Sequence, residues 1–549
     1  MRRSDTPGRV VGRSARTVSP KSRVSRLGRK KMVGAKKEPQ LLSVAATSKP
    51  LKPVEPYEVL ASSVFIDEMW VSLKNALSGG PSEWTSEKTR ATTVLRARPI
   101  REGTKYAASE LSTNEDGSIS IADPVSKEKG RDFSFDHVFN ESKRTSSAGK
   151  SSQTRIFEHL APRILTAVWK GQDATVVAVG DKGSGKTHTI FGSSIKGEKD
   201  AGMIPRFAAS IFSLIKKDSA EHSGTQWTIC VSAYIIRKDD ITDLLPTQNP
   251  TLERPSQARR TCSFFEREGI EAQVVGVERQ PISDYNGMVR VFENISIART
   301  LDASVNSKNC NVFVEFRLSR CGAPIRATTT DDPKSALDNI EDKISSTVSF
   351  VEVCASVKKN TKQSCASILE YVNSSTIGNR DTTEKTLRLC ARLLPSRDFE
   401  PEEKLQTFLR LPWSKTVAAS LLKSKFSGSG HVTLMACIHA VQQEHLATTK
   451  RLNMVTAYGS ILEFSAKSAI MAKKDKLKRL RETINELEEF VNASTIVHKE
   501  YNGKEIERSA SILFQMKKIY DMETEVIERV KSGNEIENDN VSHPSIPLP

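Results

Sequence analysis

The sequence predicts a layered α/β domain over residues 91–465 of the 549-residue chain, and three observations predict it. Runs with the pattern of strands and runs with the pattern of helices alternate through this region, as they do in layered α/β proteins. A glycine-rich phosphate loop directly follows one of the strand-like runs. Hydrophobic residues make up 37% of the chain, enough for a core in this region but few for a chain that folds throughout.

Residues 1–55 are predicted to form a disordered basic tail. Within residues 1–40, thirteen Lys and Arg accompany two acidic residues, and there is no aromatic residue. Such a segment buries too little apolar surface to offset the entropy that is lost on ordering. This stretch carries a net +11 of the chain's formal charge of +16, so the rest of the chain is nearly balanced.

Residues 56–90 are predicted to form a short amphipathic helix and a linker. Apolar residues recur there at helical spacing, and the run Gly79-Gly80-Pro81 ends the helix. The apolar positions are Leu60, Val64, Phe65, Trp70, Leu73 and Leu77.

Inside the α/β domain, six apolar runs rich in β-branched residues predict strands. Helix-like runs separate several of them, and the phosphate loop follows the second run of the set. The predicted strands cover residues 92–97, 174–179, 228–235, 312–318, 347–353 and 433–438.

Residues 466–531 are predicted to form helices, and the first carries a short coiled-coil pattern. Its apolar residues alternate in steps of three and four, which favours pairing of two chains into a homodimer through residues 470–491. Packing of the same seam back onto the domain is the open alternative. A second amphipathic helix is predicted over 505–531, and residues 532–549 are predicted to be disordered. The seam residues are Ile470, Leu477, Leu480, Ile484, Leu487 and Val491.

Composition argues against several classes of protein. No run approaches the roughly 18 apolar residues that a membrane-spanning helix needs, and no apolar stretch follows the basic N-terminus. Eight cysteines without a C-x-x-C pair argue against a disulfide scaffold and a zinc site. We therefore expect a chain of the cytoplasm without a membrane partner.

The strongest chemical signal is the phosphate loop, residues 180–187, which fits the pattern G-x-x-x-x-G-K-[ST] at every constrained position. Its glycines allow backbone N–H groups to turn inward and hold phosphate oxygens, and the following helix adds positive potential. Lys186 is expected to reach the β- and γ-phosphates of ATP, and Thr187 to ligate Mg²⁺. The predicted nucleotide-binding residues of the loop are Gly180, Asp181, Lys182, Gly183, Ser184, Gly185, Lys186 and Thr187.

Together with motifs on both sides, the loop resembles that of kinesin motor domains. Residues 180–192 read G-D-K-G-S-G-K-T-H-T-I-F-G, where kinesins read G-Q-T-G-S-G-K-T-[YH]-T-M-x-G. The runs at 94–99, 133–139 and 202–206 are similar to the kinesin motifs R-x-R-P, F-x-F-D-x-V-F and G-I-I-P-R, in the same order. The resemblance covers residues 91–465. It implies a P-loop NTPase of the kinesin motor type, with a central mixed sheet flanked by helices, that uses Mg-ATP and binds microtubules.

The resemblance also implies an adenine site. Arg96 and Pro99 stand where kinesins border the base, and His188 is placed to stack on it. A lone histidine is otherwise more often a core or surface residue.

Both nucleotide-sensing switches depart from the kinesin pattern. The first, S-S-R-S-H in kinesins, reads N-S-K-N-C at 306–310: Ser307 keeps the hydroxyl near Mg²⁺ and the γ-phosphate, and Lys308 replaces arginine. The second, D-L-A-G-S-E, reads E-V-C-A-S-V from Glu352, which keeps a carboxylate near Mg²⁺. Ala355 replaces the glycine that senses the γ-phosphate, and Val357 replaces the glutamate that pairs with the arginine.

These departures predict weak ATP hydrolysis with retained Mg-nucleotide binding, because turnover depends on the positioning of water and phosphate. The catalytic residues that the resemblance implies are Ser307, Glu352 and Lys186, and the implied Mg²⁺ ligands are Thr187 and Ser307. Shifted neighbours that restore the geometry are the open alternative.

For partners, the resemblance implies tubulin. Kinesins contact it through the helix after the second switch and near P-Y-R-D-S-K-L-T, where this chain reads P-W-S-K-T-V-A after Leu411. Clustered basic residues suit an acidic surface, although each one alone is more often a solvated side chain. The basic tail could contact tubulin or nucleic acid, or act as an import signal. The clustered residues are Lys358, Lys359, Lys362, Arg410, Lys415, Lys423 and Lys425.

Two functions fit these observations. The first is a kinesin-like, possibly slow, ATP-driven microtubule motor of the cytoskeleton. The alternative is a catalytically inactive pseudo-motor that serves as a microtubule-associated adaptor or structural protein. A nucleic-acid-binding NTPase is disfavoured, because nothing outside the tail forms a base-reading module.

Overall fold

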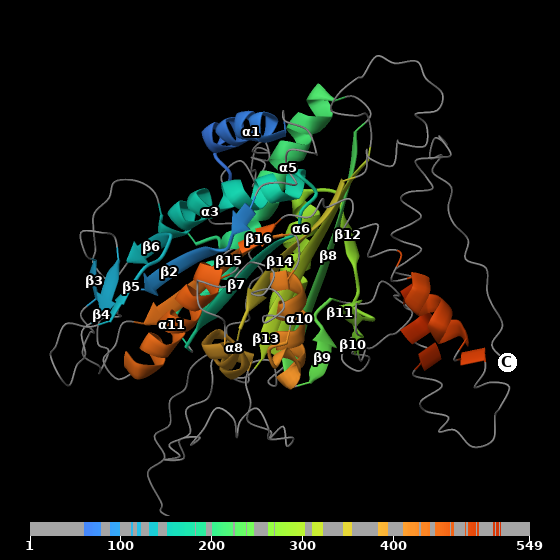
Figure 1. Ribbon diagram of the computed structural model, residues 1–549. Helices are drawn as coiled ribbons and strands as arrows, with labels where there is room; N and C mark the ends of the chain where they lie inside the picture. Colours follow the sequence, from blue (N-terminus) through green and yellow to red (C-terminus); the bar gives the residue numbers. More distant parts are fainter. Residues whose placement is uncertain are drawn as a thin grey trace, which may run out of the picture. The chain divides into compact units, whose positions relative to one another are not determined.

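Within the described residues of the computed structural model, nine strands form a mixed sheet at its centre (Figure 1). Their order is β12-β8-β13-β14-β7-β15-β2-β6, with β9 paired to β8. Neighbours from β14 through β7, β15 and β2 to β6 are parallel, and the other pairs are antiparallel. The strands are β2 (Thr92–Arg98), β6 (His137–Asn140), β7 (Ala174–Gly180), β8 (Gln226–Arg237), β9 (Asp240–Asp243), β12 (Gln280–Ile282), β13 (Asn311–Cys321), β14 (Ile344–Glu352) and β15 (His431–His439).

The structure describes most of the region from 60 to 465 and short helical pieces beyond it. The basic tail, residues 532–549 and the predicted site residues Pro99, Lys182 and Ser307 lie outside the described residues, as do Lys308, Ala355 and Val357. The described ranges are 60–77, 88–98, 111–113, 118–121, 131–140, 151–181, 183–193, 200–222, 225–237, 239–245, 262–267, 270–301, 310–321, 344–353, 383–393, 410–427, 430–439, 445–461, 463–465, 478, 481–489, 491–492, 509–510, 512–514 and 516–517.

All six predicted strands are present, and the predicted mixed α/β sheet is confirmed. Five of them lie within observed strands, and the run at 347–353 extends one residue past β14. Apolar runs predicted them well because the central strands are covered on both faces, so that every residue of β7 is buried.

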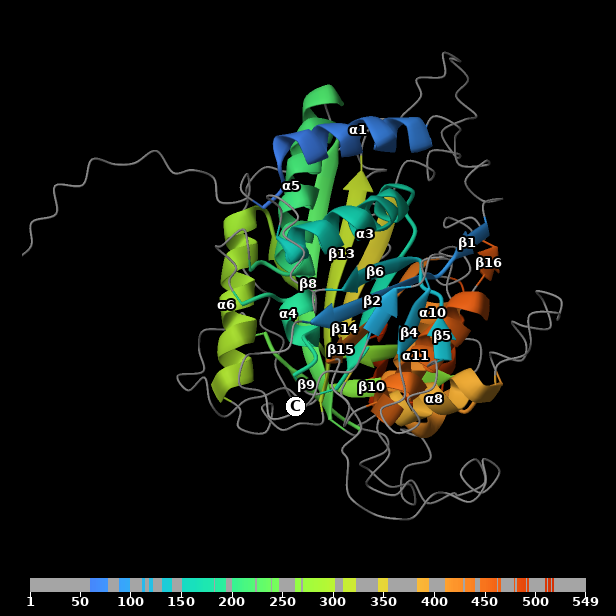
Figure 2. The same ribbon diagram turned by 90° about the vertical axis from the view of Figure 1, so that its left-hand side faces the viewer.

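Helices cover both faces of the sheet (Figures 1 and 2). On one face lie α3 (Ser152–Trp169), α4 (Lys186–Ile190), α5 (Met203–Glu221) and α6 (Tyr285–Leu301), and on the other α8 (Thr383–Leu393), α10 (Val417–Ser427) and α11 (His445–Ile461). Successive residues of β7 alternate between the two cores: Val176 and Ala178 belong to the first, and Val177 and Val179 to the second.

Smaller sheets border the central one. Strands β3 (Leu111–Thr113), β4 (Ile119–Ile121) and β5 (Arg131–Phe133) form one, and the hairpin of β10 (Ser263–Arg267) and β11 (Ile270–Val275) forms another. A short 3-10 helix, η3 (Trp413–Lys415), precedes α10. Strands β1 (Lys88–Arg90) and β16 (Glu463–Ser465) pair antiparallel, and this pairing joins the segment before the sheet to the segment after α11.

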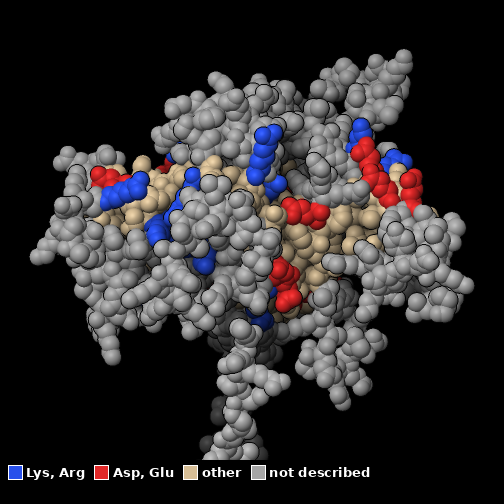
Figure 3. All heavy atoms as spheres, turned by 60° about the horizontal axis from the view of Figure 1, so that its bottom comes forward, with Lys and Arg blue, Asp and Glu red and all other residues tan. Residues whose placement is uncertain are grey.

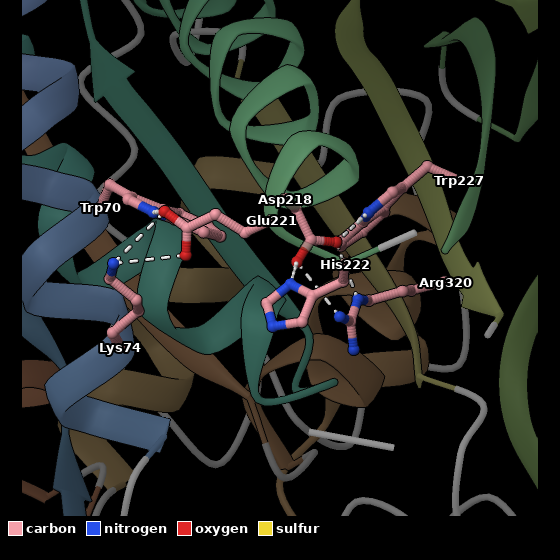
Figure 4. Close-up of polar contacts among 7 residues, drawn as sticks. All are labelled: Trp70, Lys74, Asp218, Glu221, His222, Trp227 and Arg320. Atoms are coloured by element: carbon pink, nitrogen blue, oxygen red, sulfur yellow. Dashed lines mark hydrogen bonds and ion pairs between the residues drawn. The ribbon is translucent and has the colours of Figure 1, made fainter. Parts of the chain in front are cut away.

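The N-terminal helix α1 (Ser63–Leu77) packs on α3 and α5. Trp70 is only 6% exposed, and its indole Nε1 donates a 2.6 Å hydrogen bond to Glu221 Oε1 at the end of α5 (Figure 4). This hydrogen bond lowers the pKa of the Glu221 carboxyl. Lys74 lies 3.3 Å from the same carboxylate. The helix is therefore anchored by both apolar burial and a polar contact.

One turn back on α5, Asp218 holds a second polar cluster (Figure 4). Its carboxylate accepts hydrogen bonds from Trp227 Nε1 at 2.7 Å and from Arg320 Nε and Nη2 at 3.0 and 3.1 Å. His222 Nδ1 lies 3.1 Å away. Asp218 thus connects α5 to the start of β8 and the end of β13, where Trp227 and Arg320 are paired. This is the end of the sheet opposite to Glu352, which pairs with Val312 at the start of β13.

We expect Trp70→Ala to lower the free energy of unfolding by about 3 kcal/mol, because it removes a buried ring and leaves Glu221 without its indole donor. Chemical denaturation measures the change. Val71→Ala on the exposed side of α1, where Val71 is 55% exposed, is the matched control and should change stability by less than about 0.5 kcal/mol. Equal changes in the two variants would contradict the docking of α1.

Two residues of the predicted coiled-coil seam, Ile484 and Leu487, lie in a small apolar cluster with Met516. Phe265 of β10 packs against the same cluster. These contacts are within one chain, and pairing of two chains stays a prediction. Among the described residues, no helix is long and apolar enough to cross a membrane.

Candidate nucleotide site

The phosphate loop lies at the edge of the sheet where several parallel strands end. Strand β7 runs between β14 and β15, ends at Gly180 and is followed by the loop and by α4. Because β7, β14, β15 and β2 are parallel, their carboxyl ends meet at this edge. Ligands of open α/β sheets bind at such an edge, so the fold supports a binding site at the loop.

Glycines are required by the path of the loop. Gly183 and Gly185 have φ of 82° and 101°, in the left-handed region that side chains with a Cβ disfavour. Gly180 is confined instead by its neighbours, because a Cβ there would lie 2.3 Å from the carbonyl oxygen of Cys437 and 2.3 Å from Ser184 Oγ. The loop can therefore keep this close approach to β15 only with glycine at position 180.

Lys186 is held inside the loop. Its side chain is buried, and Nζ donates hydrogen bonds to the carbonyl oxygens of Gly180 at 2.8 Å and Asp181 at 3.0 Å. The ammonium is thus fixed where the loop curls around it. Such a cation provides the positive charge that a phosphate cradle needs.

Thr187, Glu352 and Arg299 form a chain of polar contacts beside the loop. Thr187 Oγ1 donates a 2.6 Å hydrogen bond to Glu352 Oε1, since β14 and β7 are parallel neighbours and Glu352 is the last residue of β14. Arg299, in the last turn of α6, lies 3.5 Å from Glu352 Oε2, and its guanidinium stacks 4.6 Å from the ring centroid of Phe191. A hydroxyl and a carboxylate are the hard oxygen donors that Mg²⁺ prefers, so these residues fit that ion.

The expected adenine residues are placed as follows. Arg96 is 2% exposed, and its guanidinium donates to Gln153 Oε1 at 2.9 Å, Thr189 Oγ1 at 2.5 Å and Ser152 Oγ at 3.2 Å. Arg96 therefore joins β2 to α3 and α4 beneath the loop. Two residues on, Arg98 donates to the carbonyl of Gly183, and the backbone carbonyl of His188 accepts a hydrogen bond from Gln153. A base contact by Arg96, Pro99 or His188 stays a prediction.

A buried ion network reaches the loop from the other face of the sheet, which α8 and α11 cover. Arg451, on α11, donates from Nη1 to Asp181 Oδ2 at 2.9 Å and from Nη2 to Asp181 Oδ1 at 3.0 Å. Its Nε and Nη2 also donate to Glu384 Oε1 on α8, at 3.0 and 2.8 Å. Burial by itself would lower the pKa of Arg451, but Glu384 and Asp181 outweigh burial and raise it. The arginine is therefore a firmly charged group.

Sequence reasoning placed Lys186, Thr187 and Glu352 together but missed Arg299, Arg451 and Glu384. All three residues lie far from the loop in sequence, and none of them belongs to a recognisable motif. One signal in the sequence indicated a cation near the loop. Asp181 is an acidic residue in a loop that is predicted to bind phosphates, and its charge has to be compensated by a neighbouring cation.

The block expected to contact tubulin is built partly into the core. Trp413 is 1% exposed and packs against Phe426 and Tyr458. Lys425 Nζ lies 2.6 Å from Glu315 Oε1 on β13. Burial by itself would raise the pKa of Glu315, but Lys425 outweighs burial and lowers it. Lys425 is thus half-buried in an ion pair within the domain, and its contact with tubulin stays a prediction.

The face of the molecule at the lower end of Figure 1 is seen in Figure 3. Among the described residues on this face, basic and acidic side chains both occur. Arg410, one of the clustered basic residues, is exposed, and Lys423 is half-buried. Lys358, Lys359 and Lys362 lie outside the part of the chain that the structure describes.

A model of the kinesin motor domain family matches residues 95–378, more than half of the chain. Kinesin-like protein KIN-5B of Oryza sativa subsp. japonica is 26% identical over 245 residues, 43% of this chain and 22% of the relative. Kinesin heavy chain of Syncephalastrum racemosum is 30% identical over 195 residues, 35% of this chain and 19% of the relative. The chain thus matches less than a quarter of the length of these relatives.

Solved structures share the fold. A KIF14 dimer in a two-heads-bound state, with AMP-PNP and in complex with a microtubule, has a TM-score of 0.52 at 19% identity and covers 68% of this chain and 95% of its own. A structure described as a fast kinesin has a TM-score of 0.51 at 19% identity, covering 69% of this chain and 93% of its own. The structural likeness supports the fold, and the family model covers more than half of the sequence: the chain belongs to the kinesin motor domain family.

Proposed function

We propose that this chain is a kinesin-like microtubule-binding ATPase that binds Mg-ATP at the phosphate loop and hydrolyses it slowly. The observation that carries the proposal is the loop itself, with its buried lysine and its threonine at the carboxyl end of β7. Membership of the kinesin motor domain family supports microtubules as the partner. Localisation in the cytoplasm and on the cytoskeleton is part of the same proposal.

In this proposal Lys186 binds the β- and γ-phosphates, and the backbone N–H groups of the loop surround them. Thr187, Glu352 and Ser307 hold Mg²⁺, which neutralises phosphate charge when it is bound. Glu352 is one methylene longer than the aspartate of the kinesin pattern. Its carboxylate accepts a hydrogen bond directly from Thr187 Oγ1 at 2.6 Å. Arg299 orients the other oxygen of that carboxylate.

Slow hydrolysis rests on the switch substitutions. Val357 has no charge and cannot form an ion pair with Lys308. Ala355 adds a methyl group where kinesins have the glycine that senses the γ-phosphate. Arg299 engages Glu352 from α6, so the second switch begins at a carboxylate that already has two partners. These features affect the positioning of water and γ-phosphate more than they affect nucleotide binding.

We expect the triple variant Lys308→Arg, Ala355→Gly, Val357→Glu to raise microtubule-stimulated ATP turnover by about 10²-fold, because it restores the transition-state contacts of the kinesin pattern. Steady-state phosphate release measures the rate. Nucleotide affinity should stay within about threefold of that of the unaltered chain, since the loop is unchanged. Turnover by the unaltered chain at the rate of an ordinary kinesin would contradict the proposal of slow hydrolysis.

The same substitutions favour a second candidate, a pseudo-motor that binds microtubules without turnover. Co-sedimentation with microtubules in ATP, ADP or a non-hydrolysable analogue separates the two candidates. Binding that depends on the nucleotide supports a working switch. Binding that ignores the nucleotide supports the pseudo-motor, and absence of binding contradicts both.

A further inference from the structure

We propose that Arg451 is a positioning residue for nucleotide binding, which neutralises Asp181 and so allows an acidic side chain to stand in the phosphate loop. The inference rests on the proposed binding of nucleotide at this loop. It assigns a function in the site to a residue of α11, 270 positions away from Asp181 in the chain.

Asp181 poses an electrostatic problem. It is the second residue of the loop, where the kinesin pattern has a neutral glutamine, and it follows the end of β7 directly. A phosphate cradle depends on inward N–H groups and a lysine, and an uncompensated carboxylate would oppose the anionic phosphates. The loop can bind ATP only if this charge is compensated and directed elsewhere.

Arg451 meets both needs. It contacts both oxygens of Asp181 at 2.9 and 3.0 Å, which is the bidentate geometry that a planar guanidinium provides. Its side chain is 2% exposed and that of Asp181 is 14% exposed, so water screens the pair little. Because Arg451 belongs to the core behind the sheet, it draws the carboxylate towards α11.

Charges in the network balance. Glu384 accepts from Arg451 and lies 3.8 Å from Arg388 on its own helix, so that two arginines accompany two carboxylates. Glu384 and Arg451 already join α8 to α11, and Tyr458 Oη adds a 2.8 Å hydrogen bond to the carbonyl of Leu387. The packing of these helices therefore does not need Asp181, and the contact with Asp181 serves the loop.

The backbone of Asp181 also holds the loop lysine, Lys186. The carbonyl oxygen of Asp181 accepts hydrogen bonds from Lys186 Nζ at 3.0 Å and from the N–H of Ser184 at 3.1 Å. By fixing the side chain of Asp181, Arg451 also fixes the carbonyl against which Lys186 rests. The contact thus positions the phosphate-binding cation as well as neutralising the acid.

The test uses the full chain and titrates fluorescent ADP and ATP analogues. We expect Arg451→Met combined with Glu384→Gln, which removes the other buried carboxylate and leaves only Asp181 without its arginine, to lose about tenfold or more in affinity. The loss should be larger for ATP than for ADP, because ATP carries more negative charge. Adding Asp181→Asn to this pair should restore affinity to within about threefold, and Asp181→Asn alone should bind about as well as the unaltered chain.

A purely structural role of Arg451 predicts a different pattern. The triple variant would then bind as weakly as the double variant, and both nucleotides would lose affinity equally; either result overturns the inference. Equal binding by the double variant and the unaltered chain also overturns it, while leaving the proposed function intact. Failure of the unaltered chain to bind either nucleotide contradicts the proposed function itself.

Arg451→Lys keeps the charge and covers the case in which the double variant does not fold, as judged by its thermal melting curve. A single ammonium cannot reproduce the bidentate contact with the two oxygens of Asp181, so we expect about a threefold loss in affinity that Asp181→Asn reverses. Unchanged affinity of Arg451→Lys, with or without Asp181→Asn, would overturn the inference.

Discussion

We expect replacement of Lys186 with alanine to lower the affinity of the chain for ATP and ADP by about 100-fold, and to make the proposed binding to microtubules independent of the nucleotide. The reason is that Lys186 is a charged donor already fixed inside the loop by the carbonyls of Gly180 and Asp181, so that little ordering is needed when phosphate binds. Hydrogen bonds to charged groups are worth about 1.5–3 kcal/mol, and the upper end of that range corresponds to about two orders of magnitude in affinity.

Titration with a fluorescent nucleotide measures this change, and co-sedimentation measures the nucleotide dependence. Lys170→Ala, at the end of α3, is a matched control that removes a lysine outside the loop and should leave affinity unchanged. If Lys186→Ala retains the affinity of the unaltered chain, nucleotide binds elsewhere than at this loop.

Replacing Gly180 with alanine should lower the free energy of unfolding by about 3 kcal/mol and abolish nucleotide binding. The added methyl group would lie 2.3 Å from the carbonyl oxygen of Cys437, which is backbone of the neighbouring strand β15. A side chain could rotate away, but a paired strand cannot. Strands β7 and β15 must therefore separate at the point where the loop begins, and both stability and the site suffer.

Chemical denaturation and nucleotide titration of the same sample test this expectation. Gly287→Ala, in the first turn of α6, is the matched control, because its methyl group would meet only side-chain atoms, the nearest being Oδ1 of Asp284 at 3.3 Å and Cγ2 of Ile282 at 3.7 Å. We expect that variant to stay within about 1 kcal/mol of the unaltered chain. A Gly180→Ala chain as stable as Gly287→Ala would show that the loop can shift without cost.

The site was predictable where its chemistry is local. The residues from Gly180 to Thr187 are contiguous, so their pattern alone predicted a phosphate loop, and the strand predicted in front of it is present as β7. The resemblance of the run from Glu352 to the second kinesin switch implied a carboxylate near the loop, and the structure joins Glu352 to Thr187 at 2.6 Å. The substitutions at Lys308, Ala355 and Val357 are likewise visible only by comparison with the kinesin pattern.

Residues that act across the fold were not predictable. Arg451 looks like any basic residue of an amphipathic helix until the packing of α11 brings it to Asp181. Lys425 was expected among surface residues, and it is half-buried in an ion pair with Glu315 of β13. Trp413 belongs to a motif associated with tubulin contact, yet its ring fills the core. The ionic partners of Arg451 and Lys425 are more than a hundred residues away, and Trp413 packs on residues of α10 and α11, so no local pattern encodes these contacts.

By itself, the sequence determined the α/β class, the order of the strands along the chain and the pattern of the phosphate loop, and it predicts the degenerate switches, because spacing and residue type act over a few neighbouring residues. Only the tertiary structure decided which charges compensate one another: that Arg451 neutralises the acid of the loop, that Arg299 holds Glu352, and that α1 is anchored on α5 by Trp70. The physical reason is that an ion pair depends on distance and burial, and both are set by how the layers pack around the sheet.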